Sequence, residues 1–257
     1  MPVSSAAELV ALAQASEPMA AVLTAGDWYL VGSRCAGVAD HLSDWDTVIF
    51  TGSDIEYGDL PREPLDAAFG VSRPIIHGTP NLALHVLWQQ AAGVDVQVIG
   101  PTGREARERE RLAVWANELR YAIPLRLAVE IGEQYRAHVA DRFALRWPEL
   151  ALHAYREFRT SRNEAVASLP LADHAAQVLT AGAYVGWAAR YWLLAEGVPH
   201  PSDKWLLRAL ELSHGTATLL AAMRVAVDLR REPSVRFDAL WRLWELVEEH
   251  ARLTRDR

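Results

Sequence analysis

The sequence predicts an α+β protein, in which an N-terminal α/β domain with a small mixed sheet is followed by a C-terminal all-α bundle. Two observations support this fold class. Short apolar runs rich in β-branched and aromatic residues alternate with turn residues as far as Gly100. After Gly100-Pro101, apolar residues recur with a period of about 3.6 residues for nearly the whole remainder. A chain of 257 residues is long for one core, so we expect two domains, residues 1–102 and 103–257.

The N-terminal domain is predicted to begin with a helix and to continue with strands. Ser5-Ala6-Ala7-Glu8 is a capping-box pattern that opens a helix running to about Leu23, and Ala25-Gly26-Asp27 is expected to end it. The expected strands are residues 28–31, 47–50, 74–77, 82–88 and 94–99. The last two form a hairpin with a longer loop, and a short helix is expected near residues 64–69.

The second half is predicted to be a helical bundle in which proline residues break helices or start them. The expected helices are residues 103–119, 122–140, 148–167, 171–197, 203–213, 216–230 and 236–254.

Composition narrows the classes of partner. Residues 1–100 contain three Arg and twelve Asp or Glu, whereas the remainder is nearly balanced. A basic face usually marks a nucleic-acid-binding protein, so a nucleic-acid partner is disfavoured and a small, cationic ligand suits the acidic half better. The N-terminus lacks a signal-peptide pattern, and no apolar run is long enough to span a membrane. A cytoplasmic protein without a membrane partner is expected, and a homo-oligomer is left open. Cys35, the single cysteine, excludes an intrachain disulfide.

One group of residues near the predicted strands is a candidate catalytic and metal-binding site. Gly32-Ser33 follows the first strand, Asp44-Trp45-Asp46 enters the second, and Asp95 lies in the last strand of the hairpin. A lone Gly-Ser is usually a turn, and a lone Asp-x-Asp is usually solvated. The ordered combination resembles the motif of the DNA polymerase β-like nucleotidyltransferase superfamily over roughly residues 26–100. The helical half is similar to the bundle of antibiotic (aminoglycoside-type) nucleotidyltransferases and of related uncharacterised bacterial proteins.

The resemblance implies a site for Mg²⁺ and a nucleoside triphosphate. Residues two apart on a strand share a face, so Asp44 and Asp46 can both offer carboxylates to Mg²⁺. Asp95 completes a site for two metal ions, which lie about 3.5–4 Å apart in such enzymes, and can also accept the proton of the acceptor hydroxyl. Gly32 and Ser33 are expected to hold the phosphates, and Arg34 to add a charged contact or to lie at the surface.

Lys204 is the only lysine among 26 basic residues. Ser202 looks like a helix N-cap, which places this cation in a first turn, where acidic residues are favoured. Antibiotic nucleotidyltransferases place a lysine of the helical domain on the triphosphate, and Lys204 resembles that residue. The alternative is an ordinary surface lysine.

The expected function is therefore transfer of a nucleoside monophosphate, AMP from ATP or from another NTP, to a hydroxyl of a small molecule such as an aminoglycoside or another antibiotic. Two alternatives remain open: nucleotidylation of protein or tRNA, as in toxin–antitoxin systems, and a non-catalytic nucleotide-binding module. The length of the helical half argues against the first alternative, and the presence of all three carboxylates argues against the second.

Overall fold

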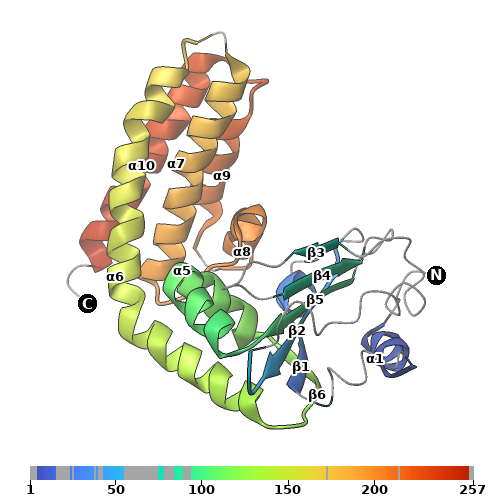
Figure 1. Cartoon of the computed structure of the whole chain (residues 1–257). Coiled ribbons are helices and arrows are strands. Elements are labelled where there is room, and N and C mark those ends of the chain that lie inside the picture. Colours follow the sequence, from blue (N-terminus) through green and yellow to red (C-terminus); the bar gives the residue numbers. More distant parts are fainter. Residues whose placement is uncertain are drawn as a thin grey trace. The chain divides into compact units, whose positions relative to one another are not determined.

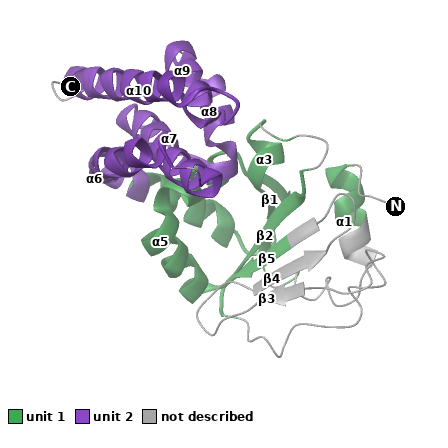
Figure 2. Cartoon of the chain, turned by 90° about the horizontal axis from the view of Figure 1, so that it is seen from above, with its two compact units in different colours: residues 1–141 green, residues 142–257 purple. Residues whose placement is uncertain are grey.

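The structure of the protein is a computed structural model. This structure describes residues 5–15, 24, 26–37, 39, 43–54, 75–77, 84–88, 94–171, 173–213 and 215–254. The chain divides into two compact units, Met1–Asp141 and Arg142–Arg257 (Figure 2). The first unit is mixed α/β, and the second is helical in its described residues. The division falls at residue 141, whereas the sequence analysis places the domain boundary at residue 102.

The first unit is built on a six-stranded mixed sheet of order β3-β4-β5-β2-β1-β6 (Figure 1). Its strands are β1 (Gly26–Leu30), β2 (Trp45–Thr51), β3 (Ile75–His77), β4 (Leu84–Trp88), β5 (Val94–Ile99) and β6 (Ile123–Arg126). β2 and β5 pair in parallel, and the other neighbours pair antiparallel. The predicted β4–β5 hairpin is therefore confirmed.

β6 corrects the predicted helix 122–140. Ile123 pairs with Leu30 and Pro124 pairs with Tyr29, which adds an edge strand to the sheet. The sequence predicts that the prolines of this half, Pro124 among them, break helices or start them. A proline, which has no amide hydrogen, is also tolerated on an edge strand, and this second possibility is the one the structure adopts.

Asp27 lies inside β1 and is fully buried, which corrects its predicted place at the end of a helix. Its Oδ1 accepts backbone N–H bonds from Ala128, Val129 and Glu130, and its Oδ2 accepts one from Gly132. Burial acts to raise the pKa of Asp27, but these four hydrogen bonds outweigh it and hold the pKa below its usual value. One carboxylate thus fixes the segment that leads from β6 into the next helix.

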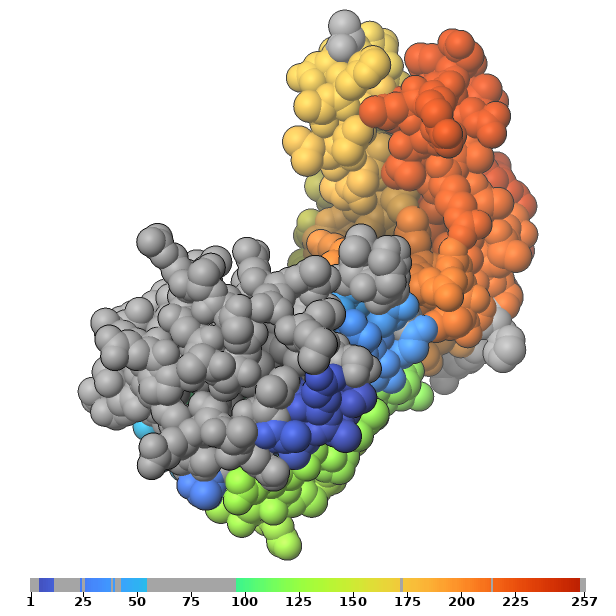
Figure 3. All heavy atoms as spheres, turned by 90° about the vertical axis from the view of Figure 1, so that its right-hand side faces the viewer, coloured from blue at the N-terminus to red at the C-terminus, as the bar shows by residue number. Residues whose placement is uncertain are grey.

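The helices of the first unit flank this sheet. α1 (Ala6–Ala15) is visible in dark blue at the surface in Figure 3 and buries Leu9. The short α3 (Gly32–Cys35) follows β1 directly. α5 (Pro101–Arg120) begins after β5, has a kink at Arg111, and packs Trp115 edge-on against Phe50 of β2. α1 is the first part of the helix predicted to run to about Leu23; its remainder, residues 16–23, and the helix predicted near residues 64–69 lie outside the described residues.

The second unit consists of α7 (His174–Ala195), η2 (Asp203–Trp205), α8 (Leu206–Glu211), α9 (Ala217–Val227), α10 (Pro233–Thr254) and the C-terminal part of α6 (Ile131–Ser168). α6 continues through Pro148, where the sequence predicts a break. An interior proline costs about 3 kcal/mol. The packing of α6 offsets this cost, because Phe158 stacks between Tyr184 of α7 and Trp244 of α10.

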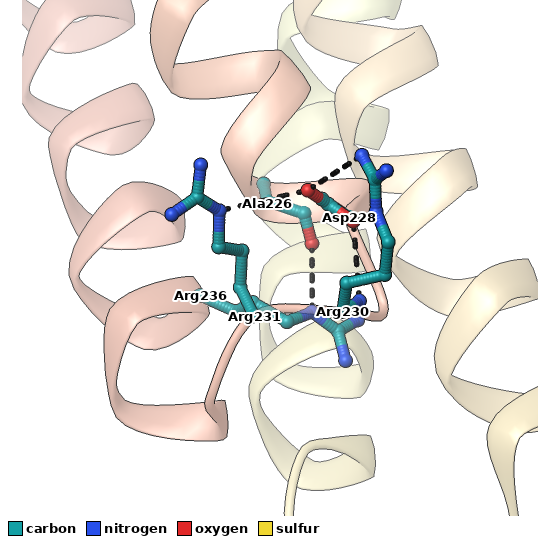
Figure 4. Close-up of polar contacts among 5 residues, drawn as sticks. All are labelled: Ala226, Asp228, Arg230, Arg231 and Arg236. Carbon is teal, nitrogen blue, oxygen red and sulfur yellow. Dashed lines mark hydrogen bonds and ion pairs between the residues drawn. The ribbon is translucent and has the colours of Figure 1, made fainter.

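Arg236 of α10 is buried in the second unit. Its Nε donates to the carbonyl of Ala226 near the end of α9 (Figure 4), and its Nη1 donates to the side-chain oxygen of Gln177. The carbonyl end of α9 carries partial negative charge, which compensates a buried cation. Asp228, just beyond α9, pairs with Arg230 and Arg231 at the surface (Figure 4).

Within the described part of the chain, the structure contains no helix that is both long enough and apolar enough to cross a membrane.

Candidate functional site

The junction between β1 and α3 brings Gly32 against the side chain of Asp46. Gly32 has a φ of +75°, a left-handed conformation that favours glycine. A Cβ atom added to it would lie 2.3 Å from Oδ2 of Asp46 and 2.9 Å from its Cγ. The amide of Val31 also donates to the carbonyl of Asp46 over 2.8 Å. Two predicted site residues that are fourteen positions apart are therefore in direct contact.

Ser33 follows within the same turn and is only 5% exposed. Its carbonyl accepts a hydrogen bond from the amide of Ala39, and the carbonyl of Gly32 accepts one from Ala36. The turn after β1 is thereby held by its own backbone. The predicted contact of the Ser33 hydroxyl with phosphate stays a prediction.

Arg34 connects this turn to the carboxylate-bearing segment. Its Nε donates to the carbonyl of Asp44 over 3.1 Å, its Nη2 donates to the carbonyl of Ser43, and its guanidinium carbon lies 4.4 Å from the ring centre of Trp45. Sequence reasoning missed this role, because a side chain that reaches ten positions along the chain leaves no periodic pattern. The predicted contact with nucleotide remains untested.

Asp44 and Asp46 flank the first residue of β2. Asp44 immediately precedes the strand and is exposed, whereas Asp46 is the second residue of the strand and is half-buried. Carboxylate oxygens are the hard donors that Mg²⁺ prefers, and Mg²⁺ sites commonly combine one or two carboxylates with substrate phosphates. The donor set at the entrance of β2 therefore fits this ion.

Asp95 lies on β5, as the sequence predicts, and pairs with Asp46 in the parallel ladder. The register places the second residue of β2 beside the second residue of β5. The side chain of Asp95 lies outside the described part of the structure. The described side chains contain no cluster of three or more His, Cys, Asp or Glu placed to hold a metal ion.

Cys35 of α3 is a partly exposed free cysteine whose thiol is protonated at neutral pH. Burial raises the pKa of Cys35 to about 11, and the charge of Asp46 acts in the same direction, while a backbone hydrogen bond involving Ile123 opposes them. A thiol with so high a pKa is a poor nucleophile at neutral pH. This raised pKa argues against a nucleophilic role for Cys35.

Lys204 belongs to the second unit, where η2 carries it. Ser202 is the N-cap residue of η2, and the Lys204 Nζ lies 5.4 Å from the ring centre of Trp205. The preceding Asp203 forms an ion pair with Arg190 of α7, which holds this segment on the bundle. The nearby His200 is buried, and burial lowers its pKa to about 4. The predicted contact of Lys204 with the triphosphate stays a prediction.

Comparisons with known proteins leave the family open. The chain matches no protein-family model and no curated protein. Among solved structures it is similar to a nucleotidyltransferase-like protein from Exiguobacterium sibiricum 255-15, with a TM-score of 0.45 and 11% sequence identity over 92% of this chain and 74% of that chain. An identity and a TM-score this low assign neither family nor activity to this chain.

Proposed function

We propose that this protein is a metal-dependent nucleotidyltransferase, which moves a nucleoside monophosphate from an NTP, ATP in the first instance, to a hydroxyl of a small acceptor and releases pyrophosphate. The observation that supports it most directly is the contact of Gly32 with Asp46. A left-handed glycine pressed against a strand carboxylate fixes the turn after β1 beside the entrance of β2. In the parallel pairing of β2 with β5, Asp95 is the register partner of Asp46.

Each residue has a distinct role in the proposal. Asp44 and Asp46, with Asp95, would hold Mg²⁺, whose charge stabilises the phosphates during transfer of the nucleotidyl group. Asp95 would also accept the proton of the attacking hydroxyl. Transfer of a phosphoryl-type group depends chiefly on positioning and on neutralising charge, which carboxylates at fixed strand positions support.

The remaining contacts concern the nucleotide and the acceptor. Gly32, Ser33 and Arg34 from the first unit, and Lys204 from the second, are proposed to bind the phosphates. The acceptor is proposed to be a small cation of the aminoglycoside type or another antibiotic, because the twelve acidic residues of the first hundred would attract positive charge.

The reaction can be tested with the full chain, Mg²⁺ and each of the four α-labelled NTPs. Candidate acceptors are incubated with the protein, and mass spectrometry records a gain of one nucleoside monophosphate. Asp44→Asn and Asp46→Asn should each abolish transfer. Asp141→Asn, an exposed aspartate of α6 in the same unit, is the matched control and should retain it.

The same experiment separates the alternatives. Transfer at the wild-type rate by Asp46→Asn would exclude the proposed mechanism. Label recovered in protein or tRNA, rather than in small molecules, would replace the small acceptor by a macromolecule. Binding of NTP without transfer to any acceptor class would favour a nucleotide-binding module.

A further inference from the structure

The second unit contains a cavity that the proposed reaction does not use. It has a volume of about 720 Å³, within the range of small-molecule sites. α6, α7 and α10 each contribute to its lining, and its described lining residues all belong to the second unit. The residues on which the argument depends are Trp147, Leu152, Tyr155, Tyr191, Glu196 and Thr254.

Aromatic rings form much of the wall. Tyr155 and Tyr191 are 7% and 5% exposed, and their ring centres lie 5.3 Å apart. The Tyr155 hydroxyl donates to Glu248, and the Tyr191 hydroxyl is 3.3 Å from the hydroxyl of Thr254. Because both hydroxyls have partners in the protein, a ligand would meet these residues mainly through their rings.

The described residues that line the cavity carry a single formal charge, which is negative. Glu196 is the only carboxylate among the described lining residues, and none of them is Lys or Arg. His250 holds Glu196 through a 2.8 Å contact between Nε2 and Oε1, and the His250 ring stacks on Trp192 at 4.0 Å. The carboxylate is thereby placed at the cavity while its side chain stays 44% exposed.

Two helix ends add to this negative potential. α7 ends at Ala195 and α10 ends at Thr254, and both residues line the cavity. The carbonyl end of a helix carries partial negative charge and favours cations. The aromatic wall already attracts one cation of the protein, because the guanidinium of Arg159 lies 5.7 Å from the ring centre of Tyr155.

We propose that this cavity binds an organic monocation, in which a protonated or quaternary amine is attached to an apolar body of aromatic size. The ring faces would bind the body and the charge, and Glu196 with the two helix ends would bind the charge. The site does not depend on the proposed nucleotidyl transfer, because the lining residues that the structure describes lie in the helical unit.

Three ligands of similar shape and different charge test the proposal on the full chain: 2-phenylethylamine, 2-phenylethanol and 3-phenylpropanoate. Titration calorimetry at pH 7 should show the amine binding about tenfold more tightly than the alcohol, and the carboxylate not binding at millimolar concentration. Equal affinities for amine and alcohol would overturn the inference, and so would absence of binding by all three.

Variants of the lining locate the binding. Leu152 is 48% exposed, so Leu152→Trp can fill the cavity without disturbing the core, and it should abolish binding of the amine. Leu179 of α7 is 72% exposed and is not among the described lining residues, so Leu179→Trp is the matched control and should bind the amine normally. Amine binding that survives Leu152→Trp would place the ligand elsewhere.

Charge variants test the role of Glu196. Glu196→Gln should weaken the amine about tenfold and leave the alcohol unchanged, whereas Glu245→Gln, an exposed glutamate of α10, should change neither. Asp46→Asn should retain amine binding even though it abolishes the proposed transfer. Loss of amine binding in Asp46→Asn would assign the cation to the carboxylates of the first unit and refute the cavity.

Discussion

Gly32→Ala tests whether the contact between Gly32 and Asp46 holds the candidate site in place. Two costs can be separated in this variant. An alanine with φ near +75° is strained by roughly 1–2 kcal/mol. Its Cβ would also lie 2.3 Å from Oδ2 and 2.9 Å from Cβ of Asp46, so the aspartate side chain must move, and such overpacking costs about 1–3 kcal/mol more.

Gly37→Ala is the matched control. Gly37 has nearly the same φ, +71°, but no heavy atom of the described residues lies within 4 Å of the Cβ that alanine would add. Urea unfolding of both variants isolates the steric cost, because each carries the backbone strain and only Gly32→Ala displaces Asp46. We expect Gly32→Ala to be less stable than Gly37→Ala by about 1–3 kcal/mol.

Activity should separate the two variants further. A displacement of about 1 Å at a reacting group can reduce the rate about a hundredfold. Nucleotidyl transfer by Gly32→Ala should therefore fall by about this factor, while Gly37→Ala stays close to wild type. Equal stability and equal activity of the two variants would show that the turn does not constrain Asp46.

Three further predictions concern Asp27, Arg236 and Cys35. Asp27→Asn should destabilise the protein by about 2–4 kcal/mol at pH 7, measured by urea unfolding, because an amide cannot accept four backbone hydrogen bonds. Folding lowers the pKa of Asp27, so the stability that its carboxylate contributes is complete above the unfolded pKa of about 3.9. This stability is lost as the pH falls through the folded pKa. A difference in the free energy of unfolding between wild type and Asp27→Asn that persisted at lower pH would contradict this cause. Arg236→Met should lower the free energy of unfolding by about 1–3 kcal/mol, because the Ala226 carbonyl loses its guanidinium donor. Arg230 is exposed, so Arg230→Met should unfold at a urea midpoint near that of the wild type. Cys35 should react slowly with a disulfide reagent at pH 7 and accelerate toward pH 11; a rate that levels off below pH 8.5 would contradict the raised pKa.

The sequence predicts best those elements whose residues form a long or strongly patterned run. The ranges 94–99 and 171–197 correspond to β5 and α7, and the hairpin that contains β5 is confirmed. In each of these segments the spacing of the apolar residues along the chain is enough to predict a strand or a helix.

The errors occur where a distant contact decides the local structure. β6 forms because β1 offers an edge to it, and Pro124 fits that edge. α6 continues through Pro148 because its aromatic face packs on α7 and α10. Asp27 looks like a turn residue in the sequence, but its partners lie about a hundred positions later. No local pattern carries these contacts.

The candidate site shows the same division. The motif predicts which residue types occur and where they lie on the strands, and the structure supplies the contacts that join them. Gly32 touches the Asp46 side chain, and Arg34 binds the carbonyls of Ser43 and Asp44. Both contacts run from the turn after β1 to the entrance of β2. β1 and β2 pair antiparallel, and Leu30 at the end of β1 pairs with Thr47 near the start of β2. The turn after β1 and the carboxylates at the entrance of β2 therefore meet at the same end of this ladder. Any change that shifts the register of β1 would therefore move Gly32 away from Asp46 and also break the contact of Arg34 with the Asp44 carbonyl. The pairing of these two strands is thus as important to the proposed chemistry as the carboxylates themselves.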